Sequence, residues 1–75
     1  MAKLPQVSGK DMGRVLARLG FHLADQKGSH MKFIRKFNNR KEIIIVPNHK
    51  VLRKGTMNNI LKKIYLSIGE LKKLL

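Results

Sequence analysis

The sequence predicts a small α+β domain in the order α-β-β-β-α-α, with a three-stranded antiparallel sheet and its helices on one face. Two segments repeat apolar residues at positions i, i+3, i+4 and i+7, a spacing typical of amphipathic helices. Between them lie three short segments rich in β-branched and aromatic residues, separated by residues that favour turns. The 75-residue chain has no linker or internal repeat, so we expect one domain over residues 1–75.

The first helix is expected to follow Ser8, which is a favourable N-cap. Asp11, three residues later, can return a hydrogen bond to Ser8 as in a capping box. One apolar stripe follows, made of Met12, Val15, Leu16 and Leu19. Gly20 comes directly after this stripe and suits the left-handed residue that ends many helices.

Three strands are predicted, over residues 21–26, 30–37 and 41–46. In the first strand, Phe21 and Leu23 share one face. In the second, alternation puts Met31, Phe33 and Phe37 on one face and His30, Lys32, Ile34 and Lys36 on the other. If Met31 and Phe33 face the core, His30 must therefore point away from it. The apolar run 43–46 predicts that the third strand is central and substantially buried, and Pro47 should end it.

Turns are expected at 27–29 and 38–40, where glycine and asparagine residues occur. Thr56 is the predicted N-cap of a second helix. The apolar stripe of that helix consists of Met57, Ile60, Leu61 and Ile64. Ser67 and Glu70 repeat the capping-box spacing and should open a short terminal helix with apolar residues Ile68, Leu71, Leu74 and Leu75.

Positive charge is the strongest global feature of the chain. Lys and Arg number 17 against 4 Asp and Glu, which gives a net charge of +13. Such an excess indicates a polyanionic partner: nucleic acid, an acidic protein or a membrane surface. The sequence contains no cysteine and no apolar run typical of a signal peptide or a membrane span. We therefore expect a cytoplasmic protein that does not enter a membrane.

The acidic residues exclude several kinds of catalytic site. The four carboxylates, Asp11, Asp25, Glu42 and Glu70, are scattered, whereas a two-metal nuclease needs them clustered. Three histidines without cysteine make a poor zinc site, and no glycine-rich loop of the nucleotide-binding type is present. Ser29 and His30 are adjacent on a strand and would point apart, which argues against a serine triad. We expect neither a metal nor a cofactor.

His30 is the candidate catalytic residue, because an imidazole can both take and give a proton near neutral pH. It follows Gly28 and Ser29 in a short segment that also contains Lys27. RNA supplies its own nucleophile, the 2′-hydroxyl beside each phosphate, so acid–base catalysis with lysine stabilisation suffices without a metal. The alternative is an ordinary turn followed by a strand that happens to begin with histidine.

The residues predicted to bind RNA are mostly cationic and fall in three parts of the chain. They are Lys10, Lys27, Gly28, Ser29, Lys32, Lys36, His49, Lys50, Arg53, Lys54 and Thr56. Lys54, with the N-terminal amides of the second helix, is expected to anchor a phosphate. The alternative for Lys10 and for the connection 48–55 is a solvated surface, and His22 and His49 also fit surface or turn positions.

Six short blocks occur along the chain in the order Lys3-Leu4-Pro5, Ser8-Gly9-Lys10-Asp11, Leu19-Gly20-Phe21, Gln26-Lys27-Gly28-Ser29-His30, Val46-Pro47-Asn48-His49, and Lys54-Gly55-Thr56 with Ile60-Leu61. Together they resemble the HicA toxin family, up to about Leu66. The resemblance implies a fold like the double-stranded-RNA-binding domain. It also implies a ribosome-independent mRNA interferase with His30 as catalytic histidine, neutralised by a HicB-like antitoxin. Tyr65-Leu66 departs from the family pattern, where small residues such as Ala-Gly are expected.

Two other function classes stay open. A non-catalytic RNA-binding module would read A-form shape with the same basic surface. It would lack stacking residues, since the aromatic residues Phe21, Phe33, Phe37 and Tyr65 are expected to lie mostly in the core. A DNA-binding protein or a membrane-surface peptide is the third class. Capped helices with narrow apolar stripes favour a packed domain over that class.

Overall fold

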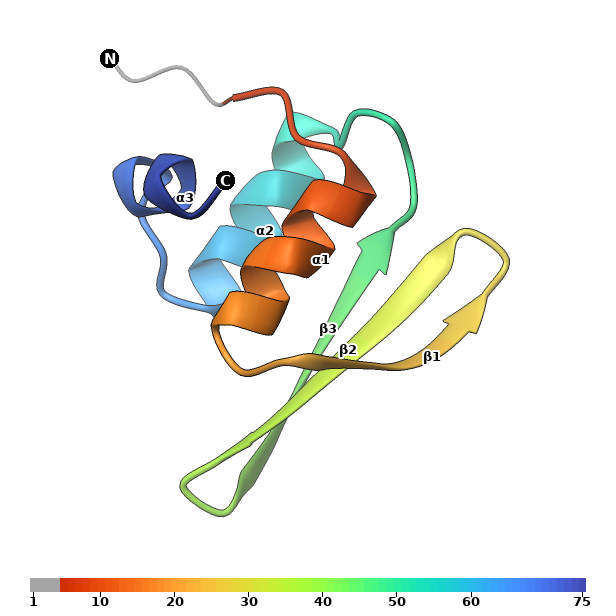
Figure 1. Cartoon of the computed structure of the whole chain (residues 1–75), viewed down its shortest axis with the longest axis vertical. Coiled ribbons are helices and arrows are strands. Elements are labelled where there is room, and N and C mark those ends of the chain that lie inside the picture. The colour runs from red at the N-terminus through yellow and green to blue at the C-terminus, as the bar shows by residue number, and fades with distance from the viewer. Residues whose placement is uncertain (1–4) are drawn as a thin grey trace.

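The computed structural model describes residues 5–75, so Lys3 and Leu4 of the first sequence block lie outside the described residues. The elements are α1 (Gly9–Arg18), β1 (His22–Lys27), β2 (His30–Phe37), β3 (Arg40–Pro47), α2 (Lys54–Lys63) and α3 (Ile68–Leu74). The three strands form one antiparallel sheet in the order β1-β2-β3, and the helices gather on one side of it (Figure 1). The predicted fold class, with its double-stranded-RNA-binding-domain-like α-β-β-β-α order and extra terminal helix, is confirmed.

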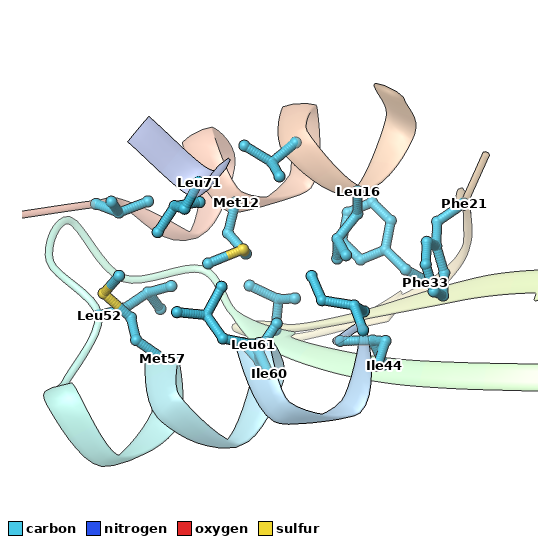
Figure 2. Close-up of a cluster of buried hydrophobic side chains, with 14 of the residues drawn as sticks. Met12, Leu16, Phe21, Phe33, Ile44, Leu52, Met57, Ile60, Leu61 and Leu71 are labelled. Atoms are coloured by element: carbon cyan, nitrogen blue, oxygen red, sulfur yellow. The ribbon is translucent and has the colours of Figure 1, made fainter. Parts of the chain in front are cut away.

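The hydrophobic core lies between the two longer helices and the inner face of the sheet. Met12 and Leu16 of α1 point toward Ile60 and Leu61 of α2 (Figure 2). Phe33 of β2 and Ile44 of β3 close the core from the sheet, and Leu71 of α3 closes it beside α1. Both helical stripes predicted from the sequence face this core. Burial of such side chains contributes about 1.5–3 kcal/mol each, so the core accounts for much of the stability.

Helix α1 begins and ends as its sequence predicts. Ser8 Oγ accepts a hydrogen bond from the Asp11 N–H at 3.0 Å, and Asp11 Oδ2 accepts one from the Ser8 N–H at 3.5 Å. At the other end, Gly20 takes a φ of +94°. The Gly20 and Phe21 N–H groups then bond back to the carbonyls of Ala17 and Leu16, which completes a Schellman motif.

The expectation for the third strand is wrong in one respect: β3 is an edge strand, not the central one. Both β1 and β3 pair with β2, so β2 occupies the centre. The four-residue apolar run of β3 therefore divides between two faces. Ile44 and Val46 are buried under the helices, whereas Ile43 and Ile45 are 42% and 46% exposed on the open face. The predicted boundaries of β2, His30–Phe37, are those observed.

Two side chains expected to help form the apolar faces lie outside the core. Leu23 pairs with Phe33 but is half-exposed, because β1 is an edge strand bent by a bulge between Leu23 and Asp25. Phe37 is 58% exposed because β2 and β3 extend past the helices toward their connecting turn (Figure 1). That turn contains Asn38 and Asn39, both with positive φ, as a two-residue type I′ hairpin requires.

Arg35 lies on the inner face of β2, between Phe33 and Phe37. Its guanidinium lies 4.5 Å from the centre of the Phe21 ring and 5.4 Å from that of Phe37. It also donates to the Leu19 carbonyl at 2.8 Å and pairs with Glu42 at 2.8 Å. This partly buried cation therefore joins the end of α1 to the distal half of the sheet.

Helix α2 begins three residues before the predicted start, so the assignment of Thr56 as N-cap is wrong. Arg53 is the N-cap, and its carbonyl accepts the first helical hydrogen bond, from the Met57 N–H. Leu52 is buried just before it and fixes where the chain turns into the helix. Helix α3 has the expected capping box between Ser67 and Glu70. Hydrogen bonds from the Ser67 backbone N–H and, to a smaller extent, from the Ser67 hydroxyl hold the pKa of the Glu70 carboxyl below its ordinary value of 4.5.

Tyr65, where the sequence departs from the family pattern, lies directly after the end of helix α2. The Tyr65 and Leu66 N–H groups bond to the Lys62 and Leu61 carbonyls, the same Schellman motif that Gly20 completes in α1. Tyr65 takes the left-handed position of this motif with a φ of +54°, and its side chain is 90% exposed. A non-glycine residue in that conformation is strained, and the exposed ring recovers little by burial.

We expect Tyr65→Gly to raise the free energy of unfolding by about 1 kcal/mol. The melting temperature should rise by about 4–8 °C, as measured by circular dichroism. Asn58→Gly, at an exposed position inside α2, is the control and should lower the melting temperature because glycine weakens a helix interior. A melting temperature that falls for Tyr65→Gly would contradict the assignment of strain to this residue.

Candidate active site

His30 lies at the start of β2, directly after a tight turn. Lys27 and His30 are the last paired residues of β1 and β2, and Gly28 and Ser29 connect them. Gly28 takes a φ of +56°, with nothing within 4 Å of where a Cβ would be. Glycine is needed here for the backbone conformation, as in type II′ turns, and not for space. The turn itself stands open to solvent.

The side chain of His30 is exposed on the face of the sheet opposite the helices. Its neighbour Met31 is buried in the core, and successive strand residues point to opposite faces. Lys27 of β1 and Pro47 of β3 lie opposite His30 in the register and share its face. Lys32 is the next residue of β2 on that face, and Asp25 of β1 lies opposite Lys32. The Asp25 Oδ1 accepts the Gln26 N–H at 2.8 Å.

Backbone hydrogen bonds bring two further segments to this end of the sheet. The Asn48 N–H donates to the carbonyl of Ser29, the residue before His30. The Gly9 N–H, at the start of α1, donates to the His49 carbonyl at 2.9 Å. The Leu52 N–H donates to the Val7 carbonyl at 2.8 Å. The loop between β3 and α2 is thus fixed between the start of α1 and the β1–β2 turn (Figure 1).

Gly9 permits the closest of these approaches. A Cβ at this position would overlap the Pro47 carbonyl oxygen and lie 2.9 Å from the Asn48 Cα. No larger residue fits unless the loop moves. Sequence reasoning missed the positioning roles of Gly9 and Asn48. A glycine directly after an N-cap and a polar residue directly after the strand-ending proline were the available signals.

Most of the cations predicted to bind RNA lie on the segments that these bonds connect. Lys10 follows Gly9, Lys27 faces His30, and the loop and the start of α2 carry His49, Lys50, Arg53 and Lys54; all are exposed, and Lys32 is half-buried. In residues 5–75 the ion pairs are Arg14–Asp11 and Arg35–Glu42. The cations around His30 therefore keep their charge available for a polyanion.

Two predicted RNA-binding residues are not part of this cluster. Lys36 pairs with Lys41 near the far turn of the sheet and lies six positions along β2 from His30, about 20 Å at 3.3 Å per residue. Thr56 is half-buried in the first turn of α2 and lines a hollow with Ile44 and Ile45. The same residues, 5–75, contain no group of three His, Asp or Glu side chains arranged to hold a metal ion.

Comparison with known proteins assigns the chain to a family. Residues 9–66 match the profile described as "HicA toxin of bacterial toxin-antitoxin", and this match extends over more than half of the chain. The chain belongs to the HicA toxin family. The match runs from Gly9 through the whole sheet to the end of α2, and so includes every segment around His30. A comparison with curated proteins gave no significant match.

Membership of the HicA family makes this chain a toxin of a toxin–antitoxin pair and implies a cognate antitoxin. Helix α3 of this HicA family member lies beyond the matched residues. It nevertheless buries Leu71 in the same core. None of the helices in residues 5–75 combines the length and the apolar character that crossing a bilayer requires.

We expect Gly9→Ala to destabilise this HicA family member by roughly 1–3 kcal/mol, because the added methyl group displaces the Pro47–Asn48 backbone. Gly55→Ala in α2 is the matched control, since nothing lies within 4 Å of its Cβ position. That control should stabilise by up to about 1 kcal/mol. Denaturant unfolding of both variants measures the difference. Equal free energies of unfolding for the two variants would show that the Pro47–Asn48 backbone leaves room for a side chain at position 9.

Proposed function

We propose that this HicA-family toxin is a metal-independent endoribonuclease, a ribosome-independent mRNA interferase with His30 as its catalytic residue. The observation that carries the proposal is the position of His30. It is an exposed imidazole at the end of a sheet, directly after a turn held by hydrogen bonds, and Lys27 and Lys32 share its face. Neither lysine is in an ion pair with another of the residues 5–75. The proposed setting is the cytoplasm, where mRNA is accessible, and the proposed partner is a HicB-like antitoxin.

The reaction needs only proton transfer and charge stabilisation. The 2′-oxygen of the RNA attacks its own phosphorus while the bond from phosphorus to the 5′-oxygen breaks, leaving a 2′,3′-cyclic phosphate and a 5′-hydroxyl. His30 makes one of the two proton transfers, from the 2′-hydroxyl or to the departing 5′-oxygen, and water or a lysine makes the other, so that one proton is lost and one is gained. Such acid–base catalysis contributes about 10² to 10⁴ in rate. Nearby lysine ammonium groups stabilise the charge that develops on the phosphate oxygens.

The surrounding residues hold the RNA backbone in this proposal. Lys27 and Lys32 flank His30 on the open face and contact the scissile and neighbouring phosphates. The exposed amides around Gly28 and Ser29 offer donors to the same phosphate. Lys10, on α1, and the cations of the loop and the start of α2, His49, Lys50, Arg53 and Lys54, bind the strand farther along. Lys36 and Thr56 lie outside this cluster, and their contact with RNA stays a prediction.

His30→Ala should abolish RNA cleavage in buffer containing EDTA while RNA binding persists, because the phosphate contacts come from other residues. Purified protein, a labelled mRNA fragment and a denaturing gel measure cleavage, and a filter assay measures binding. His22→Ala is the matched control, an exposed histidine on β1 that should retain full activity. Undiminished cleavage by His30→Ala would refute the assignment. Binding without cleavage by the unmodified protein would instead favour a non-catalytic RNA-binding module.

A further inference from the structure

The free edge of β3 carries a row of backbone groups that the strands of residues 5–75 leave unpaired, since β3 bonds to β2 on one side only. The Asn48 N–H donates to the Ser29 carbonyl, so Pro47, the neighbouring position opposite His30, belongs to the set that faces the free edge. Antiparallel strands alternate between the two sets. Ile45, Ile43 and Lys41 therefore direct their N–H and C=O groups outward, whereas Val46, Ile44 and Glu42 bond to β2.

Apolar surface lies on both sides of this edge. On the open face, Ile43 and Ile45 are nearly half-exposed beside Ile34. On the helix side, a hollow between β3 and α2 is lined by Ile44, Ile45, Thr56, Asn59, Ile60 and Lys63. An added strand would place alternate side chains against the isoleucines and over this hollow.

Charge decides what kind of strand fits. On the open face Lys32 lies opposite Ile45, and Lys36 lies opposite Lys41 of β3. Lys63 borders the hollow. The acidic residue of β3, Glu42, is paired with Arg35. A second copy of a chain with a net charge of +13 would bring like charges together across the edge. The complementary strand is acidic.

We infer that the edge of β3 is a docking site for an extended, acidic segment of a partner protein, which pairs with Lys41, Ile43 and Ile45 as a fourth strand. Edge strands are commonly protected by lysine or proline. Here Lys41 and Pro47 stand toward the two ends and leave the Ile43–Ile45 segment accessible. Within a toxin–antitoxin pair, the antitoxin is the partner that such an edge would engage. The inference does not depend on RNA cleavage by His30.

The test uses the full chain labelled with ¹⁵N and a synthetic peptide of about eight residues, a typical strand length, that alternates valine and glutamate. A peptide of identical composition, with its valines and glutamates in two blocks, is the control. Only the alternating peptide should shift the amide resonances of Lys41, Ile43 and Ile45, and it should slow their hydrogen exchange by about tenfold at saturation. The amides of Glu42 and Ile44, already bonded to β2, should change little.

Ile43→Pro removes one outward N–H and should weaken peptide binding by about tenfold or more while RNA cleavage and the fold, checked by circular dichroism, are kept. Ile43→Val keeps the N–H and should bind as the unmodified chain does. Equal binding of both peptides, or shifts centred on Lys27, Lys54 and His30, would reduce the effect to charge attraction and overturn the inference. Dimerisation through β3 without peptide would overturn it in favour of a second copy. His30→Ala should bind the peptide normally, which separates this test from that of the ribonuclease.

Discussion

The close contact of two backbones, at Gly9 and Pro47–Asn48, determines where everything else in the candidate site lies. It is possible because one residue has no side chain, and it is held by hydrogen bonds on both sides of the loop. These bonds connect the start of α1, the loop after β3 and the β1–β2 turn. A turn at the end of a two-stranded ribbon is ordinarily mobile. Here the Asn48 N–H bonds to the carbonyl of Ser29, the residue before His30, and so connects the turn to the loop that carries His49 and Lys50.

The distribution of charge follows from how the four carboxylates are used. Two cap helices, one pairs with Arg35 on the inner face of the sheet, and one bonds to the backbone of β1. The acidic residues thus make structural contacts, and the end of the sheet around His30 stays mainly cationic. Such an arrangement weakens the isolated chain by self-repulsion and favours polyanionic partners. The sheet presents two separate surfaces for them: the turn at His30 for a nucleic acid, and the edge of β3 for a protein strand.

Local features of the fold were predictable from the sequence, and features that depend on strand order were not. Ser8, Gly20 and Ser67 act through residues three or four positions away, so their roles are written in short spacings. The orientation of His30 followed from the burial of Met31 alone. By contrast, the run 43–46 looked central because periodicity does not say which strand has two neighbours. Phe37 looked like a core residue because the sequence does not say where the helices stop covering the sheet.

The candidate site divides in the same way. Lys27, Gly28, Ser29 and His30 are contiguous, so their grouping needed no tertiary information. Their meeting with Gly9 and the loop 48–53 rests on backbone bonds between distant segments, which composition and spacing do not encode. The start of α2 was predicted about one turn too late. Thr56 is a good capping residue, but the buried Leu52 fixes where the chain enters the helix. Lys36 was correctly assigned to the same face as His30, but the two residues lie near opposite ends of β2.

The central claim, that cleavage uses the 2′-hydroxyl of RNA and no metal, is tested most directly with a chemically modified substrate. An RNA oligonucleotide with a single 2′-deoxy sugar at the cleaved nucleotide is incubated with the toxin in EDTA, beside the unmodified RNA, and the products are weighed by mass spectrometry. The unmodified RNA should yield a 2′,3′-cyclic phosphate and a 5′-hydroxyl, and the modified RNA should stay intact at that nucleotide while still binding. Cleavage at the deoxy sugar, or 5′-phosphate ends that appear only when a divalent metal is added, would contradict the account.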